Sequence, residues 1–207
     1  MAYGVNAPWG LKVVGYLNGS PYNGGFREYP IASAYGTAIY KGDPVISLTD
    51  GTIGIGVAGS PVRGIFMGVK YYDSSGVFQH KNFWTASTAT LGSQTAKAMI
   101  IDDPNVVMDV QETNGSGAAG TALNLADVNL NANFYIQAGN TTTGISKVTL
   151  NNAPENTTAT LNFKILGLSP HRDNLALGVT SSTGVSFANW LVCWNTDELK
   201  SVGTTGI

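Results

Sequence analysis

The pattern of apolar and polar positions from residue 31 to residue 111 consists of short apolar runs separated by regularly spaced turn sequences. Glycine, proline, aspartate and asparagine dominate these turns, because they fix or tolerate the backbone angles that a tight turn requires. Apolar runs of this length between tight turns predict antiparallel strands arranged as meanders. The predicted strands cover residues 36–40, 45–49, 64–72, 77–86, 96–101 and 106–111.

One of these runs, GIFMGVKYY at residues 64–72, carries apolar side chains on both of its faces. Successive residues of a strand point to opposite sides, so Ile65, Met67 and Val69 share one face, while Phe66 lies on the other. The pattern therefore predicts a strand that is covered on both sides.

The pattern weakens after residue 112. The small residues of TNGSGAAGT, residues 113–121, predict a long loop or a domain boundary. Residues 123–139 fit neither the helical nor the strand period, which indicates irregular chain with one helical turn at most. Residues 158–168 alternate well and predict a strand, and a last strand is expected near residues 187–195.

The first thirty residues show no sustained periodicity but are rich in aromatic side chains. Such side chains must be buried, either on the chain's own domain or on a neighbouring subunit. We expect an extended arm that contributes interface residues, and the candidates are Tyr3, Trp9, Tyr16, Tyr22 and Phe26.

These patterns together predict a mainly β protein, an antiparallel β-barrel or sandwich with long loops and little helix. The expected organisation has three parts. An extended aromatic-rich arm covers residues 1–30, and an antiparallel β domain covers residues 31–112. Residues 113–207 form a loop-rich β region that completes the barrel or makes a second small β domain.

Composition narrows the classes of partner. Only 12% of the 207 residues are charged, the net charge is -2, and no basic cluster is present, so nucleic acid is not an expected partner. The first residues lack the basic and apolar regions of a signal peptide, and no apolar run approaches the roughly 20 residues of a membrane span. We expect synthesis in the cytoplasm and no membrane partner.

Several motifs with possible chemistry have simpler interpretations. The single cysteine, Cys193, lies in an apolar run and is expected to be buried. The glycines of GTIGIGVAG match a dinucleotide-binding pattern, but a strand rather than a helix follows them, which indicates close backbone packing instead. His80 and His171 have no metal-ligating residues at suitable spacing, and no nucleophile motif is present. We expect no catalytic residues, no cofactor and no metal.

The acidic segment IIDDPNVVMDVQE at residues 100–112 is the remaining candidate for chemistry. Asp102 and Asp103 are adjacent, and two neighbouring residues of a strand or turn do not face each other across a sugar as a glycosidase pair must. Asp-Pro-Asn is typical of a turn, which predicts a hairpin that pairs residues 98–101 with 106–111. Asp109 and Glu112 are then expected to be solvated, and a calcium ion in the turn is the alternative.

The four tryptophans, Trp9, Trp84, Trp190 and Trp194, allow two interpretations. They are expected to pack in the core, since Trp190 and Trp194 lie in one apolar run. A stacking platform for carbohydrate is the alternative.

A family resemblance rests on the order and spacing of several of these segments. The chain resembles the head decoration, or cement, proteins of tailed bacteriophages over most of residues 30–207. The segments that carry the resemblance are GTAIYKGDPVISLTDGTI, VRGIFMGVKYYDSSG, MIIDDPNVVMDVQ, LNFKILGLSPHRDN and the closing NTDEL.

The resemblance implies a structural virion protein that binds the outside of an icosahedral capsid and holds neighbouring capsid subunits together against internal DNA pressure. It implies the major capsid protein as partner, no enzymatic activity, and a homo-oligomer, with a trimer favoured by analogy. A carbohydrate- or receptor-binding β module of a phage fibre is the alternative function, and a hydrolase of unrecognised type is a third.

Overall fold

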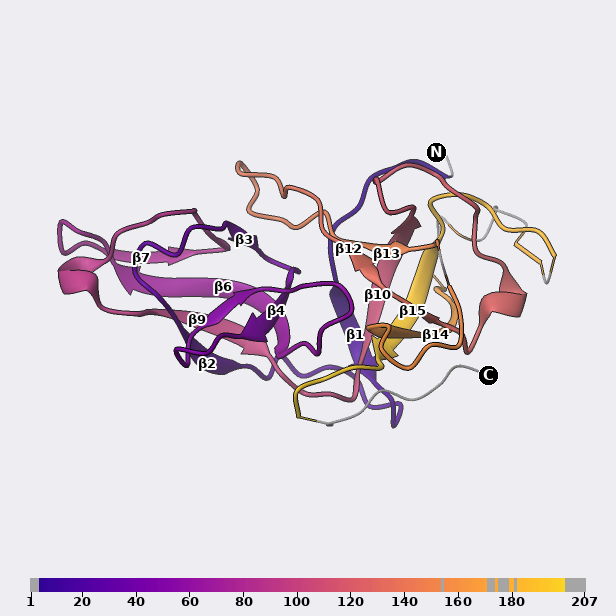
Figure 1. Cartoon of the computed structure of the whole chain (residues 1–207), viewed down its shortest axis with the longest axis horizontal. Coiled ribbons are helices and arrows are strands. Elements are labelled where there is room, and N and C mark those ends of the chain that lie inside the picture. Colours follow the sequence, from indigo (N-terminus) through magenta and orange to yellow (C-terminus); the bar gives the residue numbers. More distant parts are fainter. Residues whose placement is uncertain (1–3, 154, 171–173, 175–178, 181, 200–207) are drawn as a thin grey trace.

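The fold is known from a computed structural model that describes residues 4–153, 155–170, 174, 179–180 and 182–199. It is mainly β, as the sequence predicts, and its strands form two lobes that lie side by side along the long axis of the molecule (Figure 1). Each lobe has its own cluster of buried apolar side chains. The helical elements with described bounds are two 3-10 turns, η1 (Leu91–Ser93) and η2 (Leu125–Asp127), and Asn174 also has 3-10 geometry.

The first lobe is built on an antiparallel sheet in the order β2-β9-β6-β4-β5, with β7 on the far part of β6. A two-stranded sheet of β3 and β8 packs beside it. The bounds are β2 (Arg27–Ile31), β3 (Ile39–Tyr40), β4 (Pro44–Ser47), β5 (Ile53–Ile55), β6 (Gly64–Tyr72), β7 (Phe78–Lys81), β8 (Phe83–Trp84) and β9 (Ala96–Ile101). The bounds of β6 and β9 coincide with the predicted strands, whereas the predicted strand at 77–86 is interrupted between β7 and β8.

The central strand β6 is buried on both faces, as predicted. Ile65 belongs to the core of the second lobe, whereas Phe66, Val69 and Tyr71 belong to the core of the first. A register irregularity between Phe66 and Gly68 accompanies this change. The beginning of β6 therefore packs in the core of the second lobe and the rest of it in the core of the first, so this strand connects the two cores.

The second lobe is a seven-stranded sheet in the order β11-β14-β15-β10-β13-β12, and β1 pairs with residues 106–109 of β10. The bounds are β1 (Lys12–Tyr16), β10 (Val106–Thr113), β11 (Asn131–Ala132), β12 (Phe134–Tyr135), β13 (Thr149–Asn151), β14 (Phe163–Leu168) and β15 (Asn189–Trp194). The two end strands, β11 and β12, are separated by residue 133 alone, so the sheet curls until it is nearly closed. Closure of this kind removes exposed strand edges.

The two lobes do not follow the predicted division of the chain into residues 1–30, 31–112 and 113–207. Within residues 1–30, β1 joins the sheet of the second lobe and β2 joins that of the first. The strand β10, placed in the 31–112 domain by the sequence, belongs to the second lobe. The change from one sheet to the other falls at residues 102–105 rather than near residue 113.

The predicted hairpin between residues 98–101 and 106–111 is wrong. Both strands exist, but β9 pairs with β2 and β6, whereas β10 pairs with β1, β13 and β15. The turn chemistry is present, since the Asp103 carboxylate accepts from the Asn105 N–H at 2.8 Å. A turn sequence bends the chain but does not choose the partner of the next strand, and here the chain crosses from one lobe to the other.

Several hydrogen bonds join the lobes, and two places illustrate them. The loop at residues 136–148, between β12 and β13, reaches the first lobe, where the Lys41 N–H donates to the Gly144 carbonyl at 3.0 Å and the Ser146 N–H donates to the Lys41 carbonyl at 2.9 Å (Figure 1). At the other place, the Asn162 side chain accepts from the Gly59 N–H and donates to the Ser60 carbonyl, both at 2.7 Å. Hydrogen bonds to backbone groups of the first lobe therefore connect the lobes at both places.

Candidate functional site

At residues 102–105, the crossover where the chain passes from the first lobe to the second, the acidic residues make structural hydrogen bonds. They do not form a cluster of carboxylates. The Asp102 side chain is buried, and its Oδ2 atom accepts from the Arg27 guanidinium at 3.1 Å and from the Tyr29 hydroxyl at 2.5 Å. The Tyr29 oxygen in turn accepts from Arg63 at 2.9 Å. This network holds β2 against the crossover. In the part of the chain that the structure describes, no three His, Cys, Asp or Glu side chains gather as metal ligands would.

Replacing Asp102 with asparagine is expected to lower the free energy of unfolding by about 1 to 2 kcal/mol, because two hydrogen bonds to a charged acceptor are weakened. Asp103→Asn is the matched control, since asparagine can still accept from the Asn105 N–H. Urea unfolding of both variants checks this. Equal stability of the two variants would contradict the assigned role of Asp102.

The expectation that Asp109 and Glu112 are solvated is wrong. Asp109 is 4% exposed and Glu112 is fully buried, because β10 has strands on both edges and is covered on both faces. The Glu112 Oε2 atom accepts from the Leu123 N–H at 3.0 Å and from the Trp190 indole N–H at 3.1 Å. Burial raises the pKa of Glu112 to about 8, so this carboxyl is largely protonated at neutral pH.

The tryptophans confirm the core interpretation for the apolar run. Trp84, Trp190 and Trp194 are at most 2% exposed, and the Trp194 ring stacks on Phe163 with the ring centres 5.1 Å apart. Trp9 is the half-buried one. These four side chains therefore do not form the exposed platform that the carbohydrate alternative requires.

The cysteine and the glycines of GTIGIGVAG behave as the simpler interpretations predict. Cys193 is buried. A Cβ atom at Gly54 would lie 2.7 Å from the Tyr35 hydroxyl, and one at Gly56 would lie 2.9 Å from the Pro44 carbonyl oxygen, so these glycines allow close packing. His80 lies on β7, and His171 is outside the described residues.

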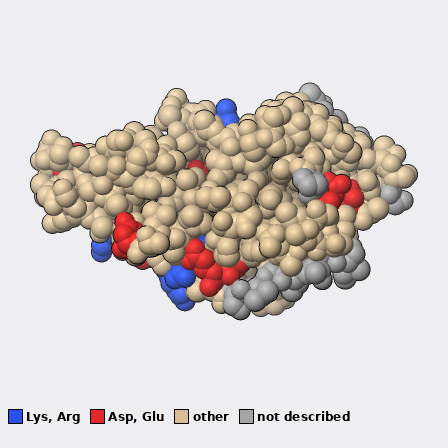
Figure 2. Space-filling model, in the orientation of Figure 1, with Lys and Arg blue, Asp and Glu red and all other residues tan. Residues whose placement is uncertain are grey.

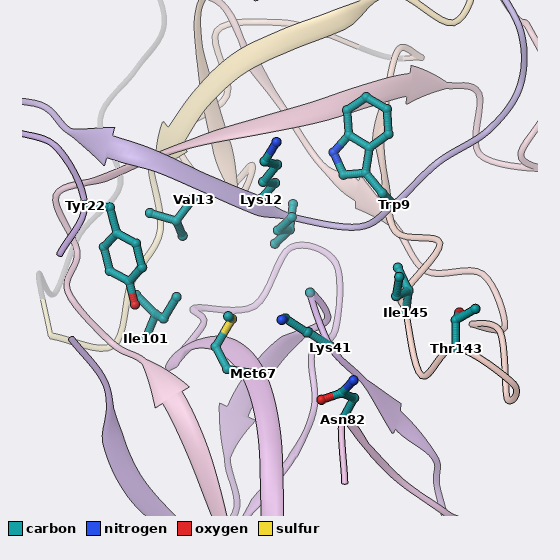
Figure 3. A pocket seen from close by; sticks show the side chains of 12 residues that line it. Trp9, Lys12, Val13, Tyr22, Lys41, Met67, Asn82, Ile101, Thr143 and Ile145 are labelled. Carbon is teal, nitrogen blue, oxygen red and sulfur yellow. The ribbon is translucent and has the colours of Figure 1, made fainter. Parts of the chain in front are cut away.

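A pocket of about 490 Å³ lies where the two lobes meet (Figure 3). Its walls include parts of β1 and of the segment before it, of β6 and β9, and of the loop at residues 136–148. Figure 3 shows the rings of Trp9 and Tyr22 on opposite sides, with Met67 and Lys41 between them. The apolar side chains that line it include Trp9, Val13, Tyr22, Met67, Ile101 and Ile145. Pockets of this volume and apolar character at the junction of two lobes are typical binding sites.

The five aromatic residues predicted for an interface lie in different places. Trp9 and Tyr22 line this pocket. The Tyr16 ring lies 6.0 Å from the Tyr22 ring, and Tyr16 and Phe26 line a second hollow beside the crossover. Phe26 is 48% exposed. Tyr3 lies outside the described residues.

The sequence did not point to the other residues that line the pocket. Lys12, Lys41, Met67, Asn82 and Ile145 come from five separate parts of the chain, and only the contact between the lobes brings them together. No spacing rule joins positions so far apart. The apolar arm residues were the only part of this site with a signal in the sequence.

Charged side chains are few on the face shown in Figure 2, and most of those visible gather along its lower edge. Several ion pairs occur among the described residues, including Arg27 with Asp102 at 3.1 Å and Lys70 with Glu28 at 3.5 Å. Lys12 and Lys41 are exposed and take part in no ion pair with the described residues. The pocket therefore has an apolar interior and a positively charged margin.

Comparisons of the chain with protein-family models, with curated proteins and with solved structures find no match. Among the residues that the structure describes, no helix has the length and apolar character needed to cross a membrane.

Proposed function

We propose that this protein is a structural component of a phage virion, which binds the outer surface of the icosahedral capsid and cements neighbouring capsid subunits. The proposal comes from the resemblance carried by the ordered segments between residues 36 and 199. The major capsid protein is the partner, and the protein is not an enzyme. Oligomerisation into a trimer belongs to the same proposal and can be measured by analytical ultracentrifugation.

The observation that best supports this function is the exposed apolar end of the first lobe. Tyr72, Val77, Phe78 and Leu91 are each between 42% and 56% exposed, and the Tyr72 and Phe78 rings contact each other with centres 5.4 Å apart. These residues lie on β6, β7, their connecting turn and η1, at the end of the molecule farthest from the second lobe (Figure 1). Grouped apolar side chains of this kind on a low-charge surface mark a protein contact.

The shape of the molecule suits a bridging role. Two lobes fixed to each other allow one copy to contact two neighbouring capsid subunits without internal movement. Because many copies act on one shell, each contact can be weak while their sum stabilises the shell.

The test uses capsids of the encoding phage assembled without this protein. The purified protein is added, and sedimentation with the capsids and release of DNA on heating are measured. Saturable binding at a fixed copy number and a higher opening temperature are expected, and capsids that already carry the protein should take up no more. Capsids that bind none of it, or that open at the same temperature with it, would refute the proposal.

A further inference from the structure

Three asparagines of this chain are followed directly by glycine, and such pairs can lose ammonia without an enzyme. They are Asn18–Gly19, Asn23–Gly24 and Asn114–Gly115. In this reaction the backbone nitrogen of the glycine attacks the side-chain Cγ atom of the asparagine, and glycine permits the approach because it has no side chain. The three pairs have the same local chemistry, so the fold decides which of them reacts.

The Asn114 pair is restrained by its backbone and by its side chain. The half-buried Asn114 donates its N–H to the Ala118 carbonyl at 2.8 Å, and its carbonyl accepts from the Gly117 N–H at 3.0 Å. Its Oδ1 atom accepts from the Ser116 N–H at 2.9 Å and from the Ala118 N–H at 2.8 Å. The attack requires the asparagine backbone to rotate relative to its side chain, and these hydrogen bonds oppose that rotation.

The Asn18 pair is exposed, but its attacking nitrogen is already engaged. The Gly19 N–H donates to the Tyr16 carbonyl at 2.9 Å. The Asn18 Oδ1 atom accepts from the Ser20 N–H at 3.0 Å. The Gly19 nitrogen must therefore leave a hydrogen bond before it can attack.

The Asn23 pair is the least restrained of the three. Both residues are exposed, and in the part of the chain that the structure describes neither makes a backbone–backbone hydrogen bond. The Asn23 Oδ1 atom accepts from the Gly25 N–H at 3.3 Å and from the Tyr16 hydroxyl at 3.4 Å, and both distances exceed the usual range. The space around the Gly24 Cα atom is also open, since a Cβ atom there would meet nothing within 4 Å.

We propose that Asn23 is a site of spontaneous deamidation in the folded protein. The Gly24 nitrogen forms a bond to the Asn23 Cγ atom, the bond from Cγ to the side-chain nitrogen breaks, and the proton of the Gly24 nitrogen leaves with the ammonia. Water then opens the resulting cyclic imide at either of its carbonyls, which gives aspartate or isoaspartate. The net change is uptake of water and release of ammonia.

The products change the surface of the N-terminal segment. Either product adds a negative charge, and isoaspartate also inserts a methylene group into the backbone. The site lies next to Tyr22, whose ring lines the pocket between the lobes (Figure 3), and Phe26 follows shortly after it. Both aromatic residues are predicted for an interface, so molecules that have aged differ from fresh ones on that surface. The reaction needs only the folded chain and water, so it does not depend on the proposed function.

The test incubates the full-length protein at pH 8 and 37 °C and follows each site by peptide mass spectrometry, which detects the replacement of NH2 by OH. We expect Asn23 to convert about fivefold faster or more than Asn18 and Asn114, because one net hydrogen bond corresponds to a factor of this size. Conversion should be slower at pH 6, since the attacking nitrogen must lose its proton. Asn23→Gln, at an exposed position, should lose most of the acidic form that accumulates in the wild type on ion exchange.

The same incubation in guanidinium chloride separates the fold from the sequence, because the unfolded chain lacks these hydrogen bonds. The three sites should then convert at similar rates. Little conversion of Asn23 in the folded protein, or conversion of Asn18 or Asn114 at an equal or higher rate, would overturn the assignment. An equal preference for Asn23 in the unfolded chain would also overturn it, since the sequence rather than the fold would then be the cause.

Discussion

Glu112→Gln is expected to remove most of the dependence of stability on pH between pH 5 and pH 7.5. Burial raises the pKa of Glu112 to about 8, above the usual value of 4.5, so the folded chain holds this proton more tightly than the unfolded chain. The stabilisation is complete below about pH 4.5 and is lost as the pH rises through about 8. At 1.36 kcal/mol for each unit of pKa, the wild type loses about 3 kcal/mol over this range.

Glutamine has nearly the same shape as the protonated acid and stays neutral, and its oxygen can still accept from Leu123 and Trp190. The variant should therefore match the wild type near pH 5 and exceed its stability at pH 7.5. The measurement is urea unfolding of both proteins at several pH values. Asp43, whose pKa burial raises to about 6, is present in both proteins and cancels in the difference. If the two proteins instead differ in free energy of unfolding by the same amount at every pH in this range, Glu112 is ionised in the folded protein.

Trp190→Ala is expected to lower the free energy of unfolding by about 3 to 5 kcal/mol. The Trp190 side chain is fully buried in the core of the second lobe, so truncation leaves a large cavity. It also removes the indole N–H that donates to Glu112. Trp9→Ala is the matched control, because Trp9 is half-buried at the pocket and its removal should cost clearly less.

The two tryptophan variants also differ in what they should do to binding. Trp9→Ala is expected to weaken capsid binding while the protein stays folded at 25 °C, whereas Trp190→Ala acts through stability alone. Denaturation curves and capsid sedimentation on the same samples separate these effects. Equal loss of stability in both variants would show that Trp9 is as much a core residue as Trp190.

The elements of this fold could be predicted from local patterns. Turn sequences such as those near residues 41–44 and 73–76 bound their strands, and alternation placed β6 and β9 at their observed residues. The capping box of η2, in which Asn124 and Asp127 each accept from the backbone of the other, accounts for the single helical turn expected in the irregular region. Each of these local structures depends on residues that are close together in the sequence, so the sequence pattern alone predicts them.

The pairing of the strands could not be predicted in the same way. The turn at residues 102–105 looks like that of a hairpin, but the side chain of Asp102 is held by Arg27 and Tyr29, far away in the sequence. Burial of Asp109 and Glu112 likewise depends on which strands flank β10. For the same reason the sequence predicted only part of the pocket. The aromatic Trp9 was a candidate site residue, whereas the loop residue Ile145 was not.

The most direct test of the account is a cryo-electron microscopy reconstruction of the capsid assembled with and without this protein. We expect added density on the outer surface in the shape of two joined β lobes, in contact with more than one capsid subunit. Capsids that look the same with and without the protein, or density confined to the tail or its fibres, would contradict it.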